Sequence, residues 1–202
     1  MQLHLIRHPR PDVAPGICYG QTDVSLAECP ATVAGRLRPL LPESFALHAS
    51  PLSRARLLAE ALGKPRLDDR LKEIHFGDWE GRSFDDIGAV IDDWAADPLG
   101  FRAPGGESPR EMAARVLAWL AEQGNMQGNM GQTPISSEIG VCPLFRHPEH
   151  LVVVAHGGPL RAIAGHLLGM PPERWLGLDF GCGQVTRIDV ESWGVVLKWF
   201  NR

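Results

Sequence analysis

Residues 151–158 read Leu-Val-Val-Val-Ala-His-Gly-Gly, a continuous apolar run that ends in a histidine and two glycines. An apolar run of this length, bounded by turn residues, is typical of a strand buried on both faces of a parallel sheet. A second run near the N-terminus, Gln2 to Ile6, leads in the same way into Arg7 and His8. In open α/β sheets, ligands bind just beyond the carboxyl ends of the strands. We therefore expect both histidines at one ligand-binding edge.

Predicted strands and helices alternate along most of the chain. Apart from the two strands above, apolar runs predict strands at residues 45–49, 184–190 and 195–200. Helices are predicted at residues 32–41, from the 50–54 turn to Gly63, and at residues 83–96, 109–122 and 159–168. This alternation favours a layered α/β sheet.

The composition is that of a globular protein without a nucleic-acid or membrane surface. The 202 residues carry a net charge of −4 and are 44% hydrophobic, enough for one buried domain, which we expect to span residues 1–202. The sequence has no basic stripe and no apolar run of about 20 residues, so neither nucleic acid nor a bilayer is an expected partner. The chain opens on a strand without a signal sequence, and its four cysteines show no C-x-x-C spacing. These features predict a cytoplasmic protein.

One region lacks any hydrophobic period. Residues 123–132 read QGNMQGNMGQ, and the connection continues without clear structure to Glu149. Long connections without secondary structure are usually lids or disordered insertions. Because this one lacks charged or aromatic anchors, we interpret residues 123–149 as a mobile insertion, with a catalytic lid as the alternative. The H-x-x-H spacing of His147 and His150 falls beside this loop around Pro148, and we predict no metal site there.

The residues at the predicted strand ends suit phosphate chemistry. The guanidinium of Arg7 can hold two phosphate oxygens at once, and a neutral imidazole such as His8 is a good nucleophile near neutral pH. His156 follows the second strand, and Gly157 offers a backbone N–H at a helix start, where anions bind. Arg54 lies at the start of the helix after the 45–49 strand, so a third strand end contributes a positively charged side chain. Each residue alone could be structural, but together they predict a phosphate site.

Four motifs then match a known family. They are Leu5–His8 (LIRH), Ser50–Ala55 (SPLSRA), Glu73–Gly81 (EIHFGDWEG) and Val154–Gly158 (VAHGG). In content and order they resemble the histidine phosphatase superfamily, which includes the cofactor-dependent phosphoglycerate mutases. The resemblance implies a three-layer α/β/α sandwich with a mostly parallel central sheet, the phosphoglycerate mutase-like fold.

The resemblance also implies roles for the cationic and imidazole side chains. His8 would be the nucleophile that becomes a phosphohistidine. Arg7, Arg54 and His156 would surround the phosphoryl oxygens, with the Gly157 backbone beside them.

Two glutamates compete for the role of acid. The resemblance implies that Glu73 protonates the departing alkoxide and then activates water. Glu80 is the alternative in the same motif, and we prefer Glu73 because it stands ahead of the aromatic-glycine step, as the family's acid does. Trp79, also in this motif, is the aromatic residue that we would test for contact with a flat substrate ring.

The chain departs from the family at two positions. The family's common form has glycine after the nucleophilic histidine, whereas this chain has Pro9, which lacks a backbone N–H. The family's pocket asparagine falls on Ala14. We expect Gln21 or Thr22 to replace its hydrogen bond to the substrate.

The implied activity is hydrolysis of a small-molecule phosphomonoester without metal or other cofactor, by a monomer or homodimer. Ile17–Asp23 (ICYGQTD) and Arg7–Pro9 most resemble the α-ribazole phosphatases, which implies α-ribazole 5′-phosphate or adenosylcobalamin 5′-phosphate as substrate. A broad-specificity phosphatase of the same superfamily is the main alternative. A mutase is disfavoured because no extra basic cluster is present. A protein that binds phosphorylated ligands without catalysis is a further alternative, favoured by Pro9 and Ala14 and opposed by the retained His8 and Glu73.

Overall fold

A six-stranded mixed sheet forms the centre of the molecule. The computed structural model describes residues 1–88, 96–125 and 149–202. The strands within them are β1 (Gln2–Arg7), β2 (Ala46–Ala49), β3 (Arg66–Leu67), β4 (His150–Ala155), β5 (Val185–Glu191) and β6 (Gly194–Trp199). Their order is β3-β2-β4-β1-β5-β6; the pairings from β3 to β1 are parallel, and those of β5 with β1 and β6 are antiparallel. The sheet is mostly parallel, as predicted.

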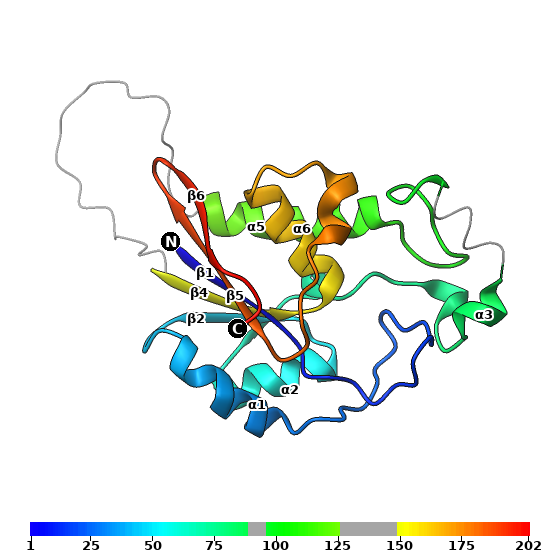
Figure 1. Cartoon of the computed structure of the whole chain (residues 1–202), viewed down its shortest axis with the longest axis horizontal. Helices are drawn as coiled ribbons and strands as arrows, with labels where there is room; N and C mark the ends of the chain where they lie inside the picture. Colours follow the sequence, from blue (N-terminus) through cyan, green and yellow to red (C-terminus); the bar gives the residue numbers. More distant parts are fainter. Residues whose placement is uncertain (89–95, 126–148) are drawn as a thin grey trace.

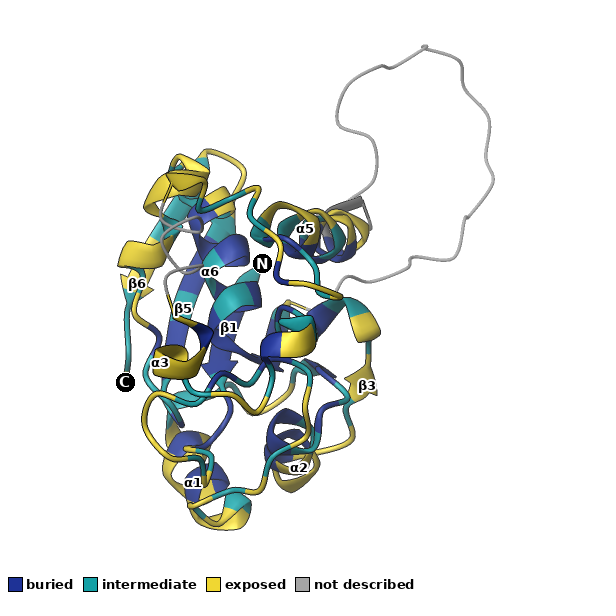
Figure 2. Ribbon diagram, turned by 90° about the vertical axis from the view of Figure 1, so that its right-hand side faces the viewer, coloured by how far each residue is buried: buried dark blue, intermediate teal, exposed yellow. Residues whose placement is uncertain are grey.

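Helices cover both faces of the sheet (Figure 1). Helices α5 (Pro109–Asn125) and α6 (Gly157–Leu167) pack on one face, and α1 (Pro30–Leu37) and α2 (Ser53–Leu62) on the other. The apolar run of β4 is continuous because it serves both cores: Leu151 and Val153 join the first, Val152 and Val154 the second. Figure 2 shows this burial through the sheet and the inner helix faces. The three-layer α/β/α sandwich is confirmed.

Local signals explain where several helices begin and end. A capping box starts α5: the Ser108 N–H donates to the Glu111 carboxylate at 2.8 Å, and the Glu111 N–H donates to Ser108 Oγ at 3.3 Å. Gly63 follows α2 directly, and Gly169, with φ of +67°, closes the end of α6. Short 3₁₀ turns lie at Arg38–Leu40 (η1), Asp69–Leu71 (η2), Gly77–Trp79 (η3) and Pro172–Gly177 (η4).

Two predicted helices have the wrong extent. The helix expected at residues 32–41 starts earlier, with Pro30 at its first position, and tightens into η1 where Pro39 lacks the N–H that an α-helix needs. The helix expected at residues 83–96 is cut short as α3 (Phe84–Ile87), because Gly88 adopts a left-handed φ of +69°. Residues 89–95 lie outside the described residues. Strand β3 was not predicted, since two residues are too few to show a period.

The predicted insertion begins too early. Residues 123–125 belong to the last turn of α5, where the Gln123 side chain is buried and donates to the Trp119 carbonyl at 3.1 Å. Residues 126–148 lie outside the described residues, so a mobile insertion there, and a single domain over the whole chain, stay predictions.

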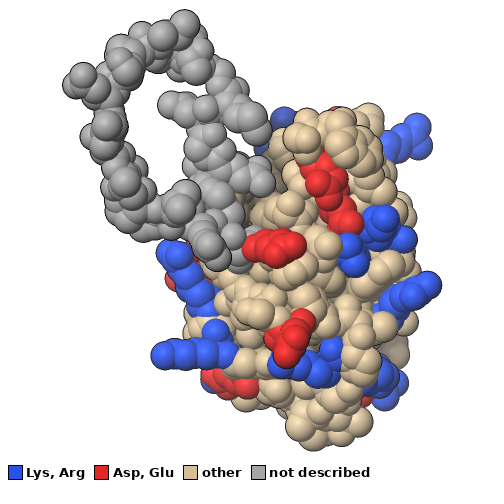
Figure 3. All heavy atoms as spheres, turned by 90° about the vertical axis from the view of Figure 1, so that its left-hand side faces the viewer, with Lys and Arg blue, Asp and Glu red and all other residues tan. Residues whose placement is uncertain are grey.

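The sequence predicts neither a membrane nor a nucleic-acid surface, and the structure bears on both predictions. Within the described ranges, no helix is both long and apolar enough to cross a bilayer. The face in Figure 3 carries acidic and basic side chains intermixed, in keeping with the small net charge.

Candidate active site

Neighbouring strand ends bring the predicted histidines together. Arg7 pairs with Ala155 in the register of β1 and β4, so His8 and His156 leave adjacent strands at the same level. The centroids of the two imidazole rings are 5.1 Å apart. Both rings are buried, and Ser50 leaves the end of β2 on the other side of β4. The parallel sheet thus assembles the centre of the site from segments far apart in the sequence.

The ring of His8 is neutral, and one of its nitrogens carries a lone pair. Its Nδ1 lies 2.7 Å from the Pro9 carbonyl oxygen, and a carbonyl can only accept, so the ring proton sits on Nδ1. Burial lowers the pKa of His8 to about 3; the hydrogen bond to Pro9 opposes this shift, and Arg54 and Arg7 add to it. Nε2 is therefore unprotonated at neutral pH, which is the form that a nucleophile requires.

His156 is fixed through both of its ring nitrogens. Arg54 Nε donates to His156 Nδ1 at 3.2 Å, so the ring proton sits on Nε2 and is donated to Ser50 Oγ at 2.7 Å. Burial, followed by the nearby His8 and Arg54, lowers the pKa of His156 well below its usual range. His156 is therefore a rigid neutral neighbour of His8.

Arg54 ties the loop before α1 to the strand ends. It is fully buried, and its terminal nitrogens donate to the carbonyls of Thr22 at 2.9 Å and Gly20 at 2.5 Å. Its guanidinium also lies 5.5 Å from the centre of the Tyr19 ring. All three nitrogens of its guanidinium thus have protein partners in this structure.

Two other guanidinium groups flank the start of α6. A Cβ placed on Gly157 would lie 3.4 Å from Arg161 Nη1 and 3.7 Å from Arg7 Cζ, so this glycine sits between them. Arg7 donates from Nη1 to the Phe180 carbonyl at 2.6 Å, whereas its Nε is buried and has no hydrogen-bond partner among the described residues. A buried donor of this kind calls for an acceptor, such as an oxygen of an anionic ligand.

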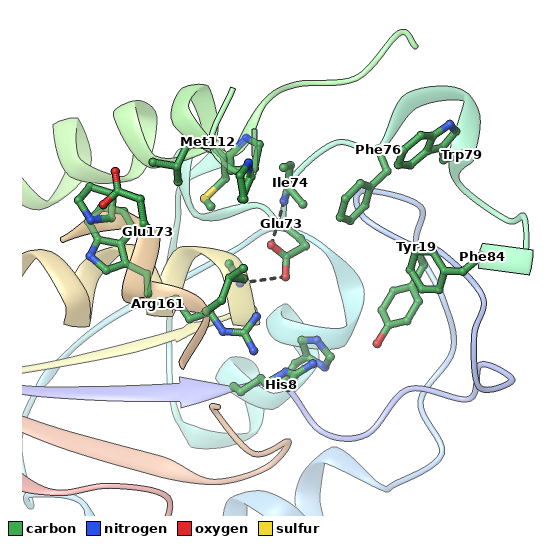
Figure 4. Close-up of a pocket in the computed structure, with 18 residues that line it drawn as sticks. His8, Tyr19, Glu73, Ile74, Phe76, Trp79, Phe84, Met112, Arg161 and Glu173 are labelled. Atoms are coloured by element: carbon green, nitrogen blue, oxygen red, sulfur yellow. Dashed lines mark hydrogen bonds between the residues drawn. The ribbon is translucent and has the colours of Figure 1, made fainter. Parts of the chain in front are cut away.

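Glu73 adds a carboxylate to this cationic end. It accepts hydrogen bonds from the backbone N–H groups of Ile74 at 2.9 Å and Gly158 at 3.2 Å. Figure 4 shows the carboxylate pointing into the cavity on the side that faces His8 and Arg161. A carboxylate and a neutral imidazole therefore line one cavity.

Glu80, the alternative to Glu73 as the acid, accepts hydrogen bonds from the protein itself. Its carboxylate is largely buried and accepts from the backbone N–H groups of Gln21, Thr22 and Phe76, and from the Thr22 hydroxyl. The Gln21 side chain donates to the Glu73 carbonyl at 3.1 Å. Neither Gln21 nor Thr22 lines the cavity described below. In this structure both residues support the loop through Glu80 and Glu73, and their contact with a substrate stays a prediction.

The cavity in front of His8 measures about 500 Å³ and has two different ends. Its inner end holds Arg7, His8, Glu73 and Arg161. Its outer walls are mainly apolar, and they comprise Tyr19, Ile74, Phe76, Trp79, Phe84, Pro98, Leu99, Pro109, Met112, Pro172, Trp175 and Leu176, together with Glu173. Among the described residues, no group of three or more His, Cys, Asp or Glu side chains is placed to hold a metal ion.

All of the site residues described above lie within the stretches of the chain that match a protein-family model. The model of the histidine phosphatase superfamily (branch 1) matches residues 3–130 and 144–202. The chain belongs to the histidine phosphatase superfamily.

The relatives of this chain are named for different activities. Glucosyl-3-phosphoglycerate phosphatase of Mycobacterium tuberculosis is 32% identical, over 92% of this chain and 82% of that protein. A 2,3-bisphosphoglycerate-dependent phosphoglycerate mutase of a Methylobacterium species is 30% identical, over 80% of this chain and 75% of that protein. The crystal structure of the α-ribazole phosphatase of Shigella flexneri has a TM-score of 0.82 at 25% identity, covering 100% of this chain and 96% of that one. The mycobacterial glucosyl-3-phosphoglycerate phosphatase structure has a TM-score of 0.76 at 27% identity, covering 99% and 98%.

Several residues of the histidine phosphatase site were not singled out from the sequence. Arg161 could have been found, because it stands four residues after Gly157, one turn along the helix that begins at the strand end. Tyr19 was noted only as part of a motif. Phe84 and Glu173 come from segments that no local pattern connects to the strand ends, and only the folded chain brings them to the cavity.

Proposed function

We propose that this chain is a metal-independent phosphomonoesterase that works through a phosphohistidine on His8, and that its substrate is α-ribazole 5′-phosphate or the related adenosylcobalamin 5′-phosphate. The observation that carries the proposal is the buried, neutral His8, with its unprotonated Nε2 in the same cavity as Glu73 and two guanidinium groups. A phosphoryl group bound there would meet a nucleophile, an acid and compensating positive charge.

In the first step, the lone pair of His8 Nε2 attacks phosphorus as the bond from phosphorus to the ester oxygen breaks. Glu73, in its acid form, gives its proton to the departing oxygen, so that the alcohol leaves neutral. The phosphorylated ring keeps its Nδ1 proton and becomes positive, and the Pro9 carbonyl stabilises that charge through the 2.7 Å hydrogen bond. The buried Nε of Arg7 donates to a phosphoryl oxygen, with Arg161 nearby.

In the second step, water replaces the alcohol. The Glu73 carboxylate removes a proton from the water as its oxygen attacks phosphorus, and the bond from phosphorus to Nε2 breaks. Inorganic phosphate leaves, His8 returns to the neutral Nδ1–H form, and Glu73 regains its proton for the next cycle. The hydrogen bonds from Gly158 and Ile74 orient the carboxylate in both steps.

The substrate proposal draws on the outer half of the cavity. α-Ribazole phosphate carries a benzimidazole ring, which is flat and largely apolar, and the outer walls are mainly aromatic and aliphatic. The structural neighbour from Shigella flexneri bears the name of this activity. Glucosyl-3-phosphoglycerate, after which a 32% identical relative is named, has a carboxylate and sugar hydroxyls that would find few polar partners on these walls.

A rate comparison tests this proposal. We expect hydrolysis in the presence of EDTA, with kcat/KM for α-ribazole 5′-phosphate at least about tenfold above the values for glucosyl-3-phosphoglycerate and 3-phosphoglycerate. Equal rates across the panel would instead support the broad-specificity alternative. No hydrolysis of any phosphomonoester would support the binder without activity, and exchange of phosphate between positions of phosphoglycerate would support a mutase.

A glycine substitution tests the position of the acid. A Cβ on Gly158 would lie 2.3 Å from Glu73 Oε1 and 3.2 Å from Met112 Cε, so Gly158→Ala must displace the Glu73 carboxylate. We expect kcat for an alkyl phosphate to fall by about 10- to 100-fold, because small misplacements of a catalytic group cost that much. Gly35→Ala, on α1 with open space around it, is the matched control. A Gly158→Ala rate within twofold of the wild-type rate would mean that Glu73 is not the acid.

A further inference from the structure

Three aromatic side chains form one wall of the cavity. They are Tyr19, Phe76 and Phe84, and we refer to them as the aromatic wall. Figure 4 shows them together on one side of His8 and Glu73, with Arg161 and Glu173 on the other side. The Tyr19 hydroxyl, which points toward His8, is the one polar side-chain group of the wall. The cavity therefore has an uncharged aromatic side and a charged side.

The segments that carry the aromatic wall also contribute to a separate hydrophobic cluster. Cys18, Trp79, Ile87 and Ala103 are buried together, apart from the two cores of the sandwich, and Phe76 packs against them. Trp79, which we had considered for ring contact, is itself largely buried and stacks on Phe101 with centroids 5.3 Å apart. Phe76 also packs against the first core of the sandwich, so it is held from both sides.

Backbone hydrogen bonds set Tyr19 and Phe84 side by side. The Phe84 N–H donates to the Gly16 carbonyl, and the Cys18 N–H donates to the Arg82 carbonyl, both at 2.8 Å. The guanidinium of Arg54, 5.5 Å from the Tyr19 ring centre, links the wall to the phosphate end. The position of the wall relative to His8 is therefore built into the fold.

Phe84 is 42% exposed, although it lines a cavity. An aromatic ring that stays open at such a place is available to cover a ligand. We propose that the aromatic wall binds a flat, uncharged ring in the alcohol part of the substrate, so that phosphomonoesters with such a ring are selected over those with sugar or carboxylate groups. This inference rests on the proposed function for the placement of the phosphate at His8.

Phosphonates test the wall by binding alone, because their carbon–phosphorus bond is not a substrate for a phosphomonoesterase. We expect 1-naphthylmethylphosphonate to bind the wild-type chain at least about tenfold more tightly than methylphosphonate, as measured by calorimetry. Phe84→Ala should remove most of this preference, and Phe84→Tyr should keep it. Because Phe84 is partly exposed, its truncation leaves the cores intact, which thermal melting would check. Leu197→Ala, at a 39% exposed apolar residue on β6, is the matched control and should keep the wild-type preference.

The outcomes separate this inference from the proposed function. Equal binding of the two phosphonates, or an unchanged preference in Phe84→Ala, would overturn the role of the wall even if the chain hydrolyses phosphomonoesters. A ring preference that Phe84→Ala removes would support the wall even if no hydrolysis is found, and in that case only the proposed activity would fail.

Discussion

Replacing His8 by alanine is expected to lower kcat by about 10⁴-fold or more, because no other described side chain that lines the cavity has a neutral nitrogen with a free lone pair. The wild-type chain, mixed with a ³²P-labelled substrate and quenched in alkali, should carry an acid-labile label on His8, and His8→Ala should carry none. Inorganic phosphate should still bind to His8→Ala, since Arg7 and Arg161 remain. Loss of turnover with retained binding is the signature of a missing nucleophile.

The control for this experiment is His166→Ala, which removes an exposed histidine of α6. It should keep the wild-type rate and the label. If His8→Ala retains a tenth of the wild-type rate, or if the label appears on another residue, His8 is not the nucleophile. Since the ring of His8 is buried, His8→Asn is a second variant that fills more of the space and should be equally inactive.

The centre of the site could be predicted because its signals are local. A continuous apolar run in the sequence indicates a buried parallel strand, and the residue after such a strand lies at the ligand-binding edge of the sheet. His8 and His156 each follow such a run. Both runs can be identified as strands from the sequence, and the pairing of Arg7 with Ala155 then brings the two histidines together. The resemblance then supplied what the strand pattern does not contain, namely the choice of Glu73.

The support of the site could not be predicted in this way. Gln21 and Thr22 lie in a loop with no period, and a residue with a free amide or hydroxyl looks like a ligand contact until its partner is known. The Gln21 amide donates to the Glu73 carbonyl, and the Thr22 hydroxyl donates to Glu80, about sixty positions away, whose carboxylate also accepts the backbone N–H groups of both residues. The pairing exists only because the segments around Cys18 and Arg82 are hydrogen-bonded to each other. Gly88 is a similar case: its left-handed φ ends α3, although the apolar pattern of the sequence continues past this glycine.

Pro9 departs from the family pattern but still fixes the tautomer of His8. Proline removes a donor that the common form of the family would have at this position, but its carbonyl still accepts the Nδ1 proton of His8. That hydrogen bond selects the tautomer with Nε2 free. The departure removes one backbone N–H that could hold a phosphoryl oxygen, and the Nε of Arg7, which has no partner among the residues that the structure describes, is another donor that could do so.

Glu73→Gln is expected to separate the two halves of the reaction. With an alkyl phosphate, whose alcohol must be protonated as it leaves, kcat should fall by about 10²- to 10⁴-fold, the usual loss when a general acid is removed. With 4-nitrophenyl phosphate the leaving group needs no proton, so phosphorylation of His8 should stay fast. The second step still needs a base, so a stoichiometric burst of nitrophenol followed by slow turnover should appear in stopped-flow absorbance.

The same measurement on Glu80→Gln distinguishes the two glutamates. Its carboxylate accepts from the backbone of residues 21 and 22, so the amide should loosen this loop and lower the rates for both substrates by similar factors, without a burst. Glu173→Gln, a cavity glutamate on the opposite side from the aromatic wall, should also show no burst. A burst in Glu80→Gln and none in Glu73→Gln would reverse the assignment. The dependence on the leaving group is decisive here, because a residue that only supports the loop slows the attack of His8 on either ester and cannot tell one departing oxygen from the other.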